Sequence, residues 1–204
     1  MELETALDVA LKKHESELRD MEIRKSELQE MSRQQPFRPS DEFVTFKIIK
    51  NVKDLIAVVT STVTSLEERF LWVAPGPVVV IASLYGINEV VKKLVERGGQ
   101  VRGICDISHP IIEAVQELLD IDEDVRHFDQ YQGIYLGVFD SKSGMSSINA
   151  DFTRISLDEP VTALYADDQT FANYLASTFE LLWEQAVPAA QRIEELLKAG
   201  PPPV

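Results

Sequence analysis

Hydrophobic residues recur at alternating steps of three and four through residues 2–34, a segment without Gly or Pro. The stripe consists of Leu7, Leu11, His14, Leu18, Met21, Lys25 and Leu28. This spacing is typical of a heptad seam and predicts a coiled-coil helix over residues 1–35. His14 and Lys25 are polar seam positions of the kind that fix register or partner number. We expect residues 1–34 to form a homodimer; the alternative is a lone amphipathic helix packed on the rest of the chain.

Pro36 and Pro39 end this helix, so residues 36–42 are expected to link it to one main domain at 43–199. Residues 200–204 form a Pro-rich tail that we expect to be disordered. Within the domain, apolar positions three and four apart predict helices at 52–70, at 80–97, from Pro110 to about Asp120, and after Asp167 or Asp168, the last kinked or divided at Pro188. Short apolar or alternating runs predict strands at 43–50, 70–74, 100–106, 124–129, 134–139, 145–148 and 160–166.

Strands and helices alternate in the first half of this domain, and consecutive strands follow in the second half. Alternation of this kind requires right-handed crossovers and parallel strands. We therefore predict an α/β fold, a three-layer sandwich with a mixed, mainly parallel sheet. Ligands of such sheets bind beyond the carboxyl ends of the parallel strands. This rule places residues 72–76, residues 105–109 and the hairpin at 133–149 near one rim.

The composition narrows the class of function. A formal charge of -14 and a sequence pI near 4.6 argue against nonspecific nucleic-acid binding by this chain alone, because phosphate neutralisation needs a basic face. Cys105 is the single cysteine, which excludes an internal disulfide. The sequence has no apolar run of bilayer length and no signal-peptide pattern, so we expect a cytoplasmic protein without a membrane partner. Scattered histidines and the lack of a Gly-rich phosphate loop predict no metal and no cofactor.

Two segments of the domain carry a resemblance to a known family. One is Leu94-Val-Glu-Arg-Gly-Gly-Gln-Val-Arg-Gly-Ile-Cys-Asp106, and the other is Phe179-Glu-Leu-Leu-Trp-Glu-Gln-Ala186 in the last helix. Together with the element order and the predicted coiled coil, they resemble the effector-sensing C-terminal domain of archaeal TrmB-type transcriptional regulators. The resemblance extends from Phe43 to Ala199, about three quarters of the chain. It implies half of a phospholipase D-like fold, a small-molecule effector and a role in transcription regulation.

The resemblance also locates a catalytic motif in the hairpin. Phospholipase D-like enzymes use H-x-K-x4-D followed by G-S-x-N, with His as nucleophile, Lys holding phosphate oxygens and Asp orienting the imidazole. With Asp140 in the Asp place, Gly133 takes the His place, Tyr135 takes the Lys place, and Ser146-Ser-Ile-Asn149 lies near the G-S-x-N place. Without the nucleophile and the cation we expect no enzymatic activity. A concave rim that has lost catalysis remains suited to ligand binding.

Seven residues are candidate ligand-binding residues on these grounds: Asp106, His109, Arg126, Tyr135, Asp140, Ser147 and Asn149. Asp106 and His109 follow a central strand where a ligand can approach, although turn and helix-cap roles are commoner for such residues. For Arg126 two roles are open: it binds an anionic ligand, or it only points outward from an edge strand. Tyr135 and Asp140 are candidates through the resemblance alone. Trp72 is either a stacking surface for a ligand or part of the core.

Two other functions remain open from the sequence. One is a hydrolase in which Asp106, His109 and Asp140 converge in one open pocket. The other is an adaptor whose residues 1–34 pair with a different protein. TrmB-type regulators carry a winged helix ahead of the coiled coil, whereas this sequence begins with the helical segment. We therefore expect DNA binding only through a missing or separate DNA-binding element.

Overall fold

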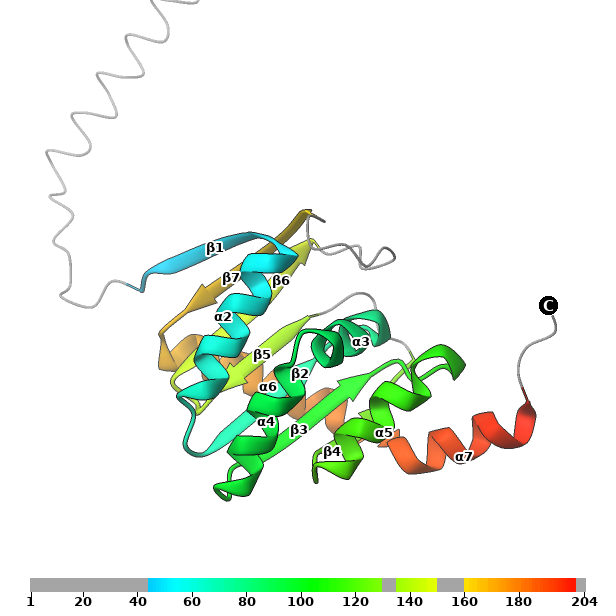
Figure 1. The fold of residues 1–204 in the computed structure, drawn as a ribbon. Coiled ribbons are helices and arrows are strands. Elements are labelled where there is room, and N and C mark those ends of the chain that lie inside the picture. The colour runs from blue at the N-terminus through cyan, green and yellow to red at the C-terminus, as the bar shows by residue number, and fades with distance from the viewer. Residues whose placement is uncertain (1–43, 130–134, 150–159, 201–204) are drawn as a thin grey trace, which may run out of the picture. The chain divides into compact units, whose positions relative to one another are not determined.

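An eight-stranded sheet runs through the part of the chain that the computed structural model describes, residues 44–129, 135–149 and 160–200 (Figure 1). All of these residues belong to one compact unit, Val44–Val204. The strand order is β1-β7-β6-β5-β2-β3-β4-β8. The strands are β1 (Phe46–Asn51), β2 (Arg69–Val73), β3 (Gln100–Cys105), β4 (Asp124–His127), β5 (Leu136–Phe139), β6 (Ser143–Asn149), β7 (Pro160–Ala166) and β8 (Val187–Pro188). The predicted coiled coil and linker lie outside the described residues.

The sheet is mixed, as predicted. Strands β2, β3 and β4 are parallel neighbours, and the other neighbouring pairs are antiparallel. Following the pairings, β1, β2, β3, β4 and β6 run in one direction and β5, β7 and β8 in the other. Most strands therefore run in one direction, as expected of a mainly parallel sheet, but most neighbouring pairs are antiparallel. The reason is that the hairpin and β7 lie between β1 and β2.

Helices cover both faces of the sheet, which confirms the three-layer sandwich (Figure 1). One face packs against α2 (Val52–Thr64), α3 (Gly76–Leu84), α4 (Ile87–Glu96) and α5 (Ile112–Asp120). The opposite face packs against α6 (Gln169–Gln185). After β8, α7 (Ala189–Ala199) returns to the first face, where Ala189 and Ile193 join its core. The sheet thus separates two hydrophobic clusters.

The helix ends follow the expected chemistry, with two corrections, the first of which is that the helix predicted at 52–70 ends at Thr64. Asn51 caps α2 by accepting a hydrogen bond from the backbone N–H of Asp54 (2.8 Å), and Asp168 caps α6 through that of Phe171 (2.6 Å). Pro188 separates α6 from α7, as predicted. The single helix predicted at 80–97 is wrong: Gly86, at φ 73°, divides it into α3 and α4. A left-handed backbone cannot continue an α-helix, and glycine adopts it without strain.

A short 3-10 helix, η1 (His109–Ile111), precedes α5 and contains Pro110. Proline is compatible with this position because the first residues of a helix have no intrahelical acceptor for their N–H groups. Within the described residues, no helix is both long and apolar enough to cross a bilayer.

Candidate functional site

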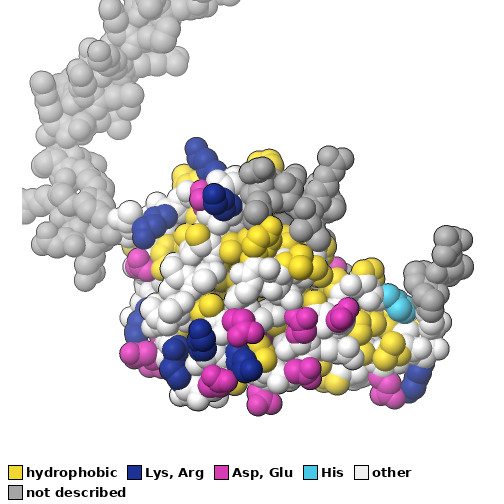
Figure 2. Space-filling view, viewed as in Figure 1, with side chains coloured by type: hydrophobic (Ala, Val, Ile, Leu, Met, Phe, Trp, Pro, Cys, Tyr) yellow, Lys and Arg dark blue, Asp and Glu magenta, His cyan; other side chains and the backbone are white. Residues whose placement is uncertain are grey.

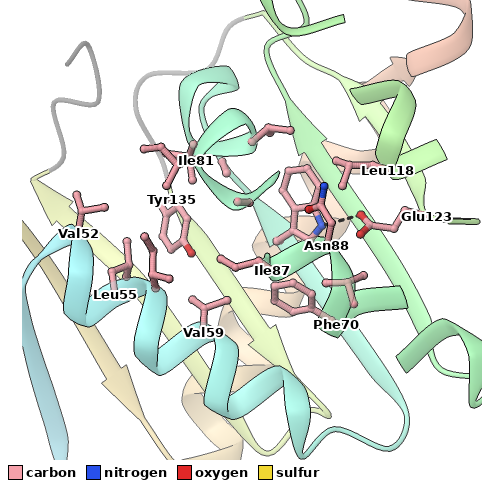
Figure 3. A pocket seen from close by; sticks show the side chains of 17 residues that line it. Val52, Leu55, Val59, Phe70, Ile81, Ile87, Asn88, Leu118, Glu123 and Tyr135 are labelled. Atoms are coloured by element: carbon pink, nitrogen blue, oxygen red, sulfur yellow. Dashed lines mark hydrogen bonds between the residues drawn. The ribbon is translucent and has the colours of Figure 1, made fainter. Parts of the chain in front are cut away.

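A cavity of about 60 Å³ lies between the sheet and the helices α2, α3, α4 and α5 (Figure 3). Its walls are mainly aliphatic and come from Val52, Leu55, Val59, Ile81, Ile87 and Leu118. Phe70 and Trp72 of β2 add aromatic rings. We call this cavity, with the residues that line it, the helix-side pocket. By volume it has room for roughly four to six water-sized atoms, at about 10–15 Å³ for each.

Glu123 is the buried acid of the helix-side pocket. It lies directly before β4, only 4% exposed, and its Oε2 accepts a hydrogen bond from Nε1 of Trp72 (3.3 Å; Figure 3). Among the described residues, no Lys, Arg or His forms an ion pair with it. Burial raises the pKa of Glu123 to about 8, and the Trp72 hydrogen bond offsets only part of that rise. Near neutral pH this carboxyl group is therefore mostly protonated.

Trp72 reaches Glu123 by passing over β3 at Gly103, a residue without a side chain. Trp72 pairs with Gly103 of β3, and Gly103 pairs in turn with Val125 of β4. A Cβ atom at position 103 would lie 2.0 Å from Cζ2 of the indole, which no side chain can accommodate. The glycine thus lets the indole lie flat over β3 and bring its N–H to the carboxyl group.

Asn88 brings a second polar group to the helix-side pocket from the first turn of α4. Its Nδ2 donates a hydrogen bond to Oε2 of Glu117 (3.3 Å), which also accepts one from Oγ of Ser83 (2.5 Å). The Oδ1 of Asn88 is buried and has no hydrogen-bond partner among the described residues. A buried acceptor without a partner is costly, so this atom is a point where a ligand could gain binding energy.

Tyr135, one of the seven residues selected from the sequence, lines the helix-side pocket (Figure 3). It precedes β5, is buried, and burial raises the pKa of its phenol. Its carbonyl oxygen accepts a hydrogen bond from the backbone N–H of Ser147 (3.0 Å). Ser147 has a buried Oγ without a hydrogen-bond partner among the described residues. Asn149 pairs with Thr162 in the sheet, and its side chain lies outside the described part.

Asp106 and His109 lie at the carboxyl end of β3, as predicted, and each makes a contact that supports the fold. Oδ1 of Asp106 accepts a hydrogen bond from the backbone N–H of Gly76 (2.6 Å), which holds the start of α3. Nε2 of His109 donates to the carbonyl oxygen of Leu196 (3.1 Å), which ties η1 to α7. Neither side chain lines the helix-side pocket.

Asp140 lies at the other end of the strands. Its backbone N–H donates to the carbonyl oxygen of Arg69 at the start of β2, whereas Asp106 follows the end of the parallel strand β3. We expected the whole hairpin near the rim formed by the carboxyl ends of the parallel strands. This was correct for Tyr135 and Ser147. It was wrong for Asp140, because the turn of a hairpin lies at the opposite end of its two strands. Asp106, His109 and Asp140 do not converge, so the geometry required for the hydrolase is not present.

The Asp140 carboxylate organises the loop before β2. It accepts three backbone hydrogen bonds, from Glu67, Glu68 and Arg69, each at 2.9 Å. Burial alone would raise the pKa of Asp140. The three N–H groups and the nearby Lys142 outweigh that effect and hold the pKa below its usual value. This carboxylate is already satisfied by the backbone.

Arg126 lies on the opposite face of the sheet from the helix-side pocket. Its guanidinium lies 4.2 Å from the ring centroid of Trp183, and Nη1 donates to the Trp183 carbonyl oxygen (3.0 Å). His127 is buried, and its Nδ1 accepts a hydrogen bond from the backbone N–H of Ile107 (2.9 Å). Burial, followed by the charge of Arg192, lowers the pKa of His127.

Glu123 and Asn88 were not among the residues selected from the sequence. A usable signal existed for Glu123, because it alternates with Val125 and His127, and all three are buried. Asn88 lies in the first turn of α4, and no sequence pattern indicated that its side chain faces a pocket. The described residues contain no group of three or more His, Cys, Asp or Glu that could hold a metal ion.

Comparisons with known proteins give the fold. No family model and no curated protein matches the sequence. Among solved structures, TrmBL2, an archaeal chromatin protein with a novel mode of DNA binding, is similar at 15% identity and a TM-score of 0.55, covering 91% of this chain and 69% of TrmBL2. Nuc from Salmonella typhimurium, a phospholipase D family member, is similar at 13% identity and a TM-score of 0.59, covering 72% of this chain and 98% of Nuc.

NucT from Helicobacter pylori is similar at 13% identity and a TM-score of 0.55, covering 72% of this chain and 99% of NucT. The described domain therefore has the phospholipase D-like fold. At these identities the likeness gives the fold and leaves the chemistry to the residues of this chain.

Proposed function

We propose that this chain, with its phospholipase D-like fold, is a non-enzymatic sensor that binds a small-molecule effector and acts in transcription regulation. The observation that carries the proposal is the helix-side pocket, in which a buried carboxyl group and an unpartnered amide oxygen stand among apolar walls. Pockets that combine apolar walls with a few placed polar groups are typical of small-molecule sites. Such burial of polar groups costs stability, which a bound ligand would restore.

The residues in the catalytic places support a function without phosphodiester chemistry. Tyr135 stands where the motif needs a lysine, and its buried phenol, whose pKa burial raises further above the ordinary value, carries no charge near neutral pH. Asp140 is held by three backbone N–H groups at the start of β2. Phosphoryl transfer of this type needs a nucleophile and a cation for the phosphate oxygens. Neither Tyr135 nor Asp140 supplies them.

The regulatory part of the proposal rests on the fold and the charge. TrmBL2 is an archaeal chromatin protein that binds DNA, and its structure is similar over 91% of this chain. Figure 2 shows acidic and basic side chains interspersed over the α4 and α5 side of the described surface, and hydrophobic ones gathered around α2 and α3. With a formal charge of -14, DNA contact would come from a separate element, and a homodimer formed through residues 1–34 would transmit the effector signal.

A thermal-shift screen with sugars, nucleotides, organic acids and amines tests effector binding, because a ligand that binds only the folded state raises its melting temperature. Val59→Phe places a ring in the helix-side pocket, and Ala57→Phe adds the same ring to the exposed face of α2. An effector should stabilise the wild type and Ala57→Phe but not Val59→Phe. Stabilisation of all three proteins to the same extent, or of none by any compound, would contradict the proposal.

The enzymatic alternative is tested separately by hydrolysis of bis(4-nitrophenyl) phosphate. We expect no turnover above that of the Asp140→Asn variant. Turnover by the wild type that Asp140→Asn abolishes would contradict a non-enzymatic role.

A further inference from the structure

The helix-side pocket presents two hydrogen-bond acceptors that lack a positive partner. Glu123 is buried, and the described residues supply it with the Trp72 hydrogen bond but with no cation. The Oδ1 of Asn88 is buried without a described partner. In Figure 3 both groups lie on the same side of the pocket, opposite Val52 and Leu55.

The orientation of the Asn88 amide is fixed by its neighbour. An amide oxygen and nitrogen can be exchanged by a flip of the side chain. Here the group that faces Oε2 of Glu117 must be the donor, because that oxygen already accepts from Ser83 and an ionised carboxylate only accepts. The oxygen of Asn88 is therefore the atom left over, and it is an acceptor.

The remaining walls suit a small organic cation. Phe70 and Trp72 line the pocket with aromatic rings, whose faces attract cations, most strongly when water is excluded. The other walls are aliphatic and would cover a short hydrocarbon chain. An anionic ligand would find no cation to pair with, because no described Lys, Arg or His forms an ion pair with Glu123.

We infer that the helix-side pocket binds a small primary amine in its ammonium form, with Glu123 and Asn88 accepting its hydrogen bonds and Trp72 beside its charge. The inference rests on the proposed function and gives the chemical class of its effector. A cavity of about 60 Å³ limits the part of the ligand inside it to roughly four to six non-hydrogen atoms. Burial raises the pKa of Glu123, so the acid is neutral in the empty pocket and releases its proton when the ammonium group enters.

The two tryptophans of the chain provide the test. Nε1–H of Trp72 donates to Glu123 in the pocket, whereas Trp183 packs against Phe179 in the cluster on the opposite face of the sheet. In an NMR titration of the full chain, the two indole N–H signals are assigned with the Trp183→Phe variant. The probes are n-propylamine, 1-propanol and propanoate, which have similar size and differ in charge.

We expect n-propylamine to shift the Trp72 signal saturably and to leave the Trp183 signal in place. Propanol and propanoate should bind at least tenfold more weakly. Glu123→Gln keeps the shape of the side chain but cannot ionise when the ammonium group enters, and it should weaken n-propylamine binding at least tenfold while the spectrum stays that of a folded protein. Asn88→Ser, on the partly exposed α4, provides a second variant with a smaller loss of affinity.

The outcomes separate the two proposals. Equal or stronger saturable shifts with propanol or propanoate would overturn the amine assignment and leave a small-molecule pocket in place. An n-propylamine shift that Glu123→Gln does not weaken would overturn the role of Glu123 and with it the inference. Equal shifts of both indole signals would mean nonspecific binding and would overturn it as well. No saturable shift from any probe would overturn the amine assignment, whereas the screen with the Val59→Phe variant decides the proposed function independently.

Discussion

The indole of Trp72 occupies the space that a side chain at Gly103 would need, with 2.0 Å between Cζ2 and the position of an added Cβ atom. The two residues are paired in the parallel strands β2 and β3. Because of this pairing, the Trp72 side chain extends over β3, and its N–H donates a hydrogen bond to Glu123 beside β4. A single methyl group at position 103 should therefore change the helix-side pocket indirectly, by displacing the Trp72 indole.

Gly103→Ala should displace the indole and break its hydrogen bond to Glu123. Overpacking of a dense core costs about 1–3 kcal/mol, and we expect a loss of unfolding free energy in that range. Urea denaturation measures the loss, and the Trp72 indole N–H signal should move in the NMR spectrum. Gly98→Ala, at φ 90° with no atom within 4 Å of the added Cβ, is the control for a glycine whose cost is backbone strain alone. An unchanged Trp72 signal in Gly103→Ala would contradict this account.

Glu123 should make the protein less stable as pH rises. Its pKa is raised to about 8 from the ordinary value of 4.5, so the folded state holds a proton that the unfolded state has lost. The stabilising effect is complete below pH 4.5 and is lost through pH 8, by up to about 1.4 kcal/mol per pH unit. Comparison of urea denaturation at pH 5, 6.5 and 8 should show the wild type losing stability relative to Glu123→Gln. Parallel curves for the two proteins would show that this acid is ionised in the folded state.

Asp140 should contribute stability without affecting ligand binding. Asp140→Asn leaves one acceptor oxygen and turns an amide group towards a backbone N–H, so we expect a loss of about 1–3 kcal/mol in unfolding free energy. Its pKa is lowered in the folded state, so this contribution is present above the ordinary carboxyl pKa and disappears as pH falls through the folded value. The difference between wild type and variant should therefore narrow in acid. Lys142→Ala, which removes an exposed charge 3.9 Å away, should cost less than 1 kcal/mol.

Residues 1–34 should hold the chain as a dimer. Leu18→Glu places a charge in the middle of the predicted seam and should give a monomer by light scattering, because a buried unpaired charge is strongly unfavourable. Glu17→Ala, off the seam, should remain dimeric. A wild-type chain that is monomeric on its own would favour the adaptor, with a different protein as the partner.

Much of the fold could be predicted because the local signals agree with one another. The run from Pro160 to Ala166 forms β7 with those same bounds, and the capping residues Asn51 and Asp168 begin their helices as expected. Gly86 was missed because apolar residues on both sides of it keep the helical spacing. A positive φ at one glycine changes the direction of the chain without changing that pattern.

The site was harder to predict because it depends on pairing between distant segments. Trp72 and Glu123 are 51 residues apart, and their contact requires the register that places Gly103 between them. The motif comparison selected Asp140, but the direction of the hairpin put this residue at the other end of the sheet. What the sequence did contain was the alternation of Glu123, Val125 and His127, which predicts an acid facing inward once the strand is assigned.

The central claim is that an effector enters the helix-side pocket and contacts Glu123. The most direct test is a crystal structure of the full chain with the compound that stabilises it most in the thermal-shift screen. The account predicts that compound between α2, α3, α4 and β2, with a donor group within hydrogen-bonding distance of the Glu123 carboxyl group. A compound bound at any other place, with the pocket unchanged and Glu123 still paired only with Trp72, would contradict it.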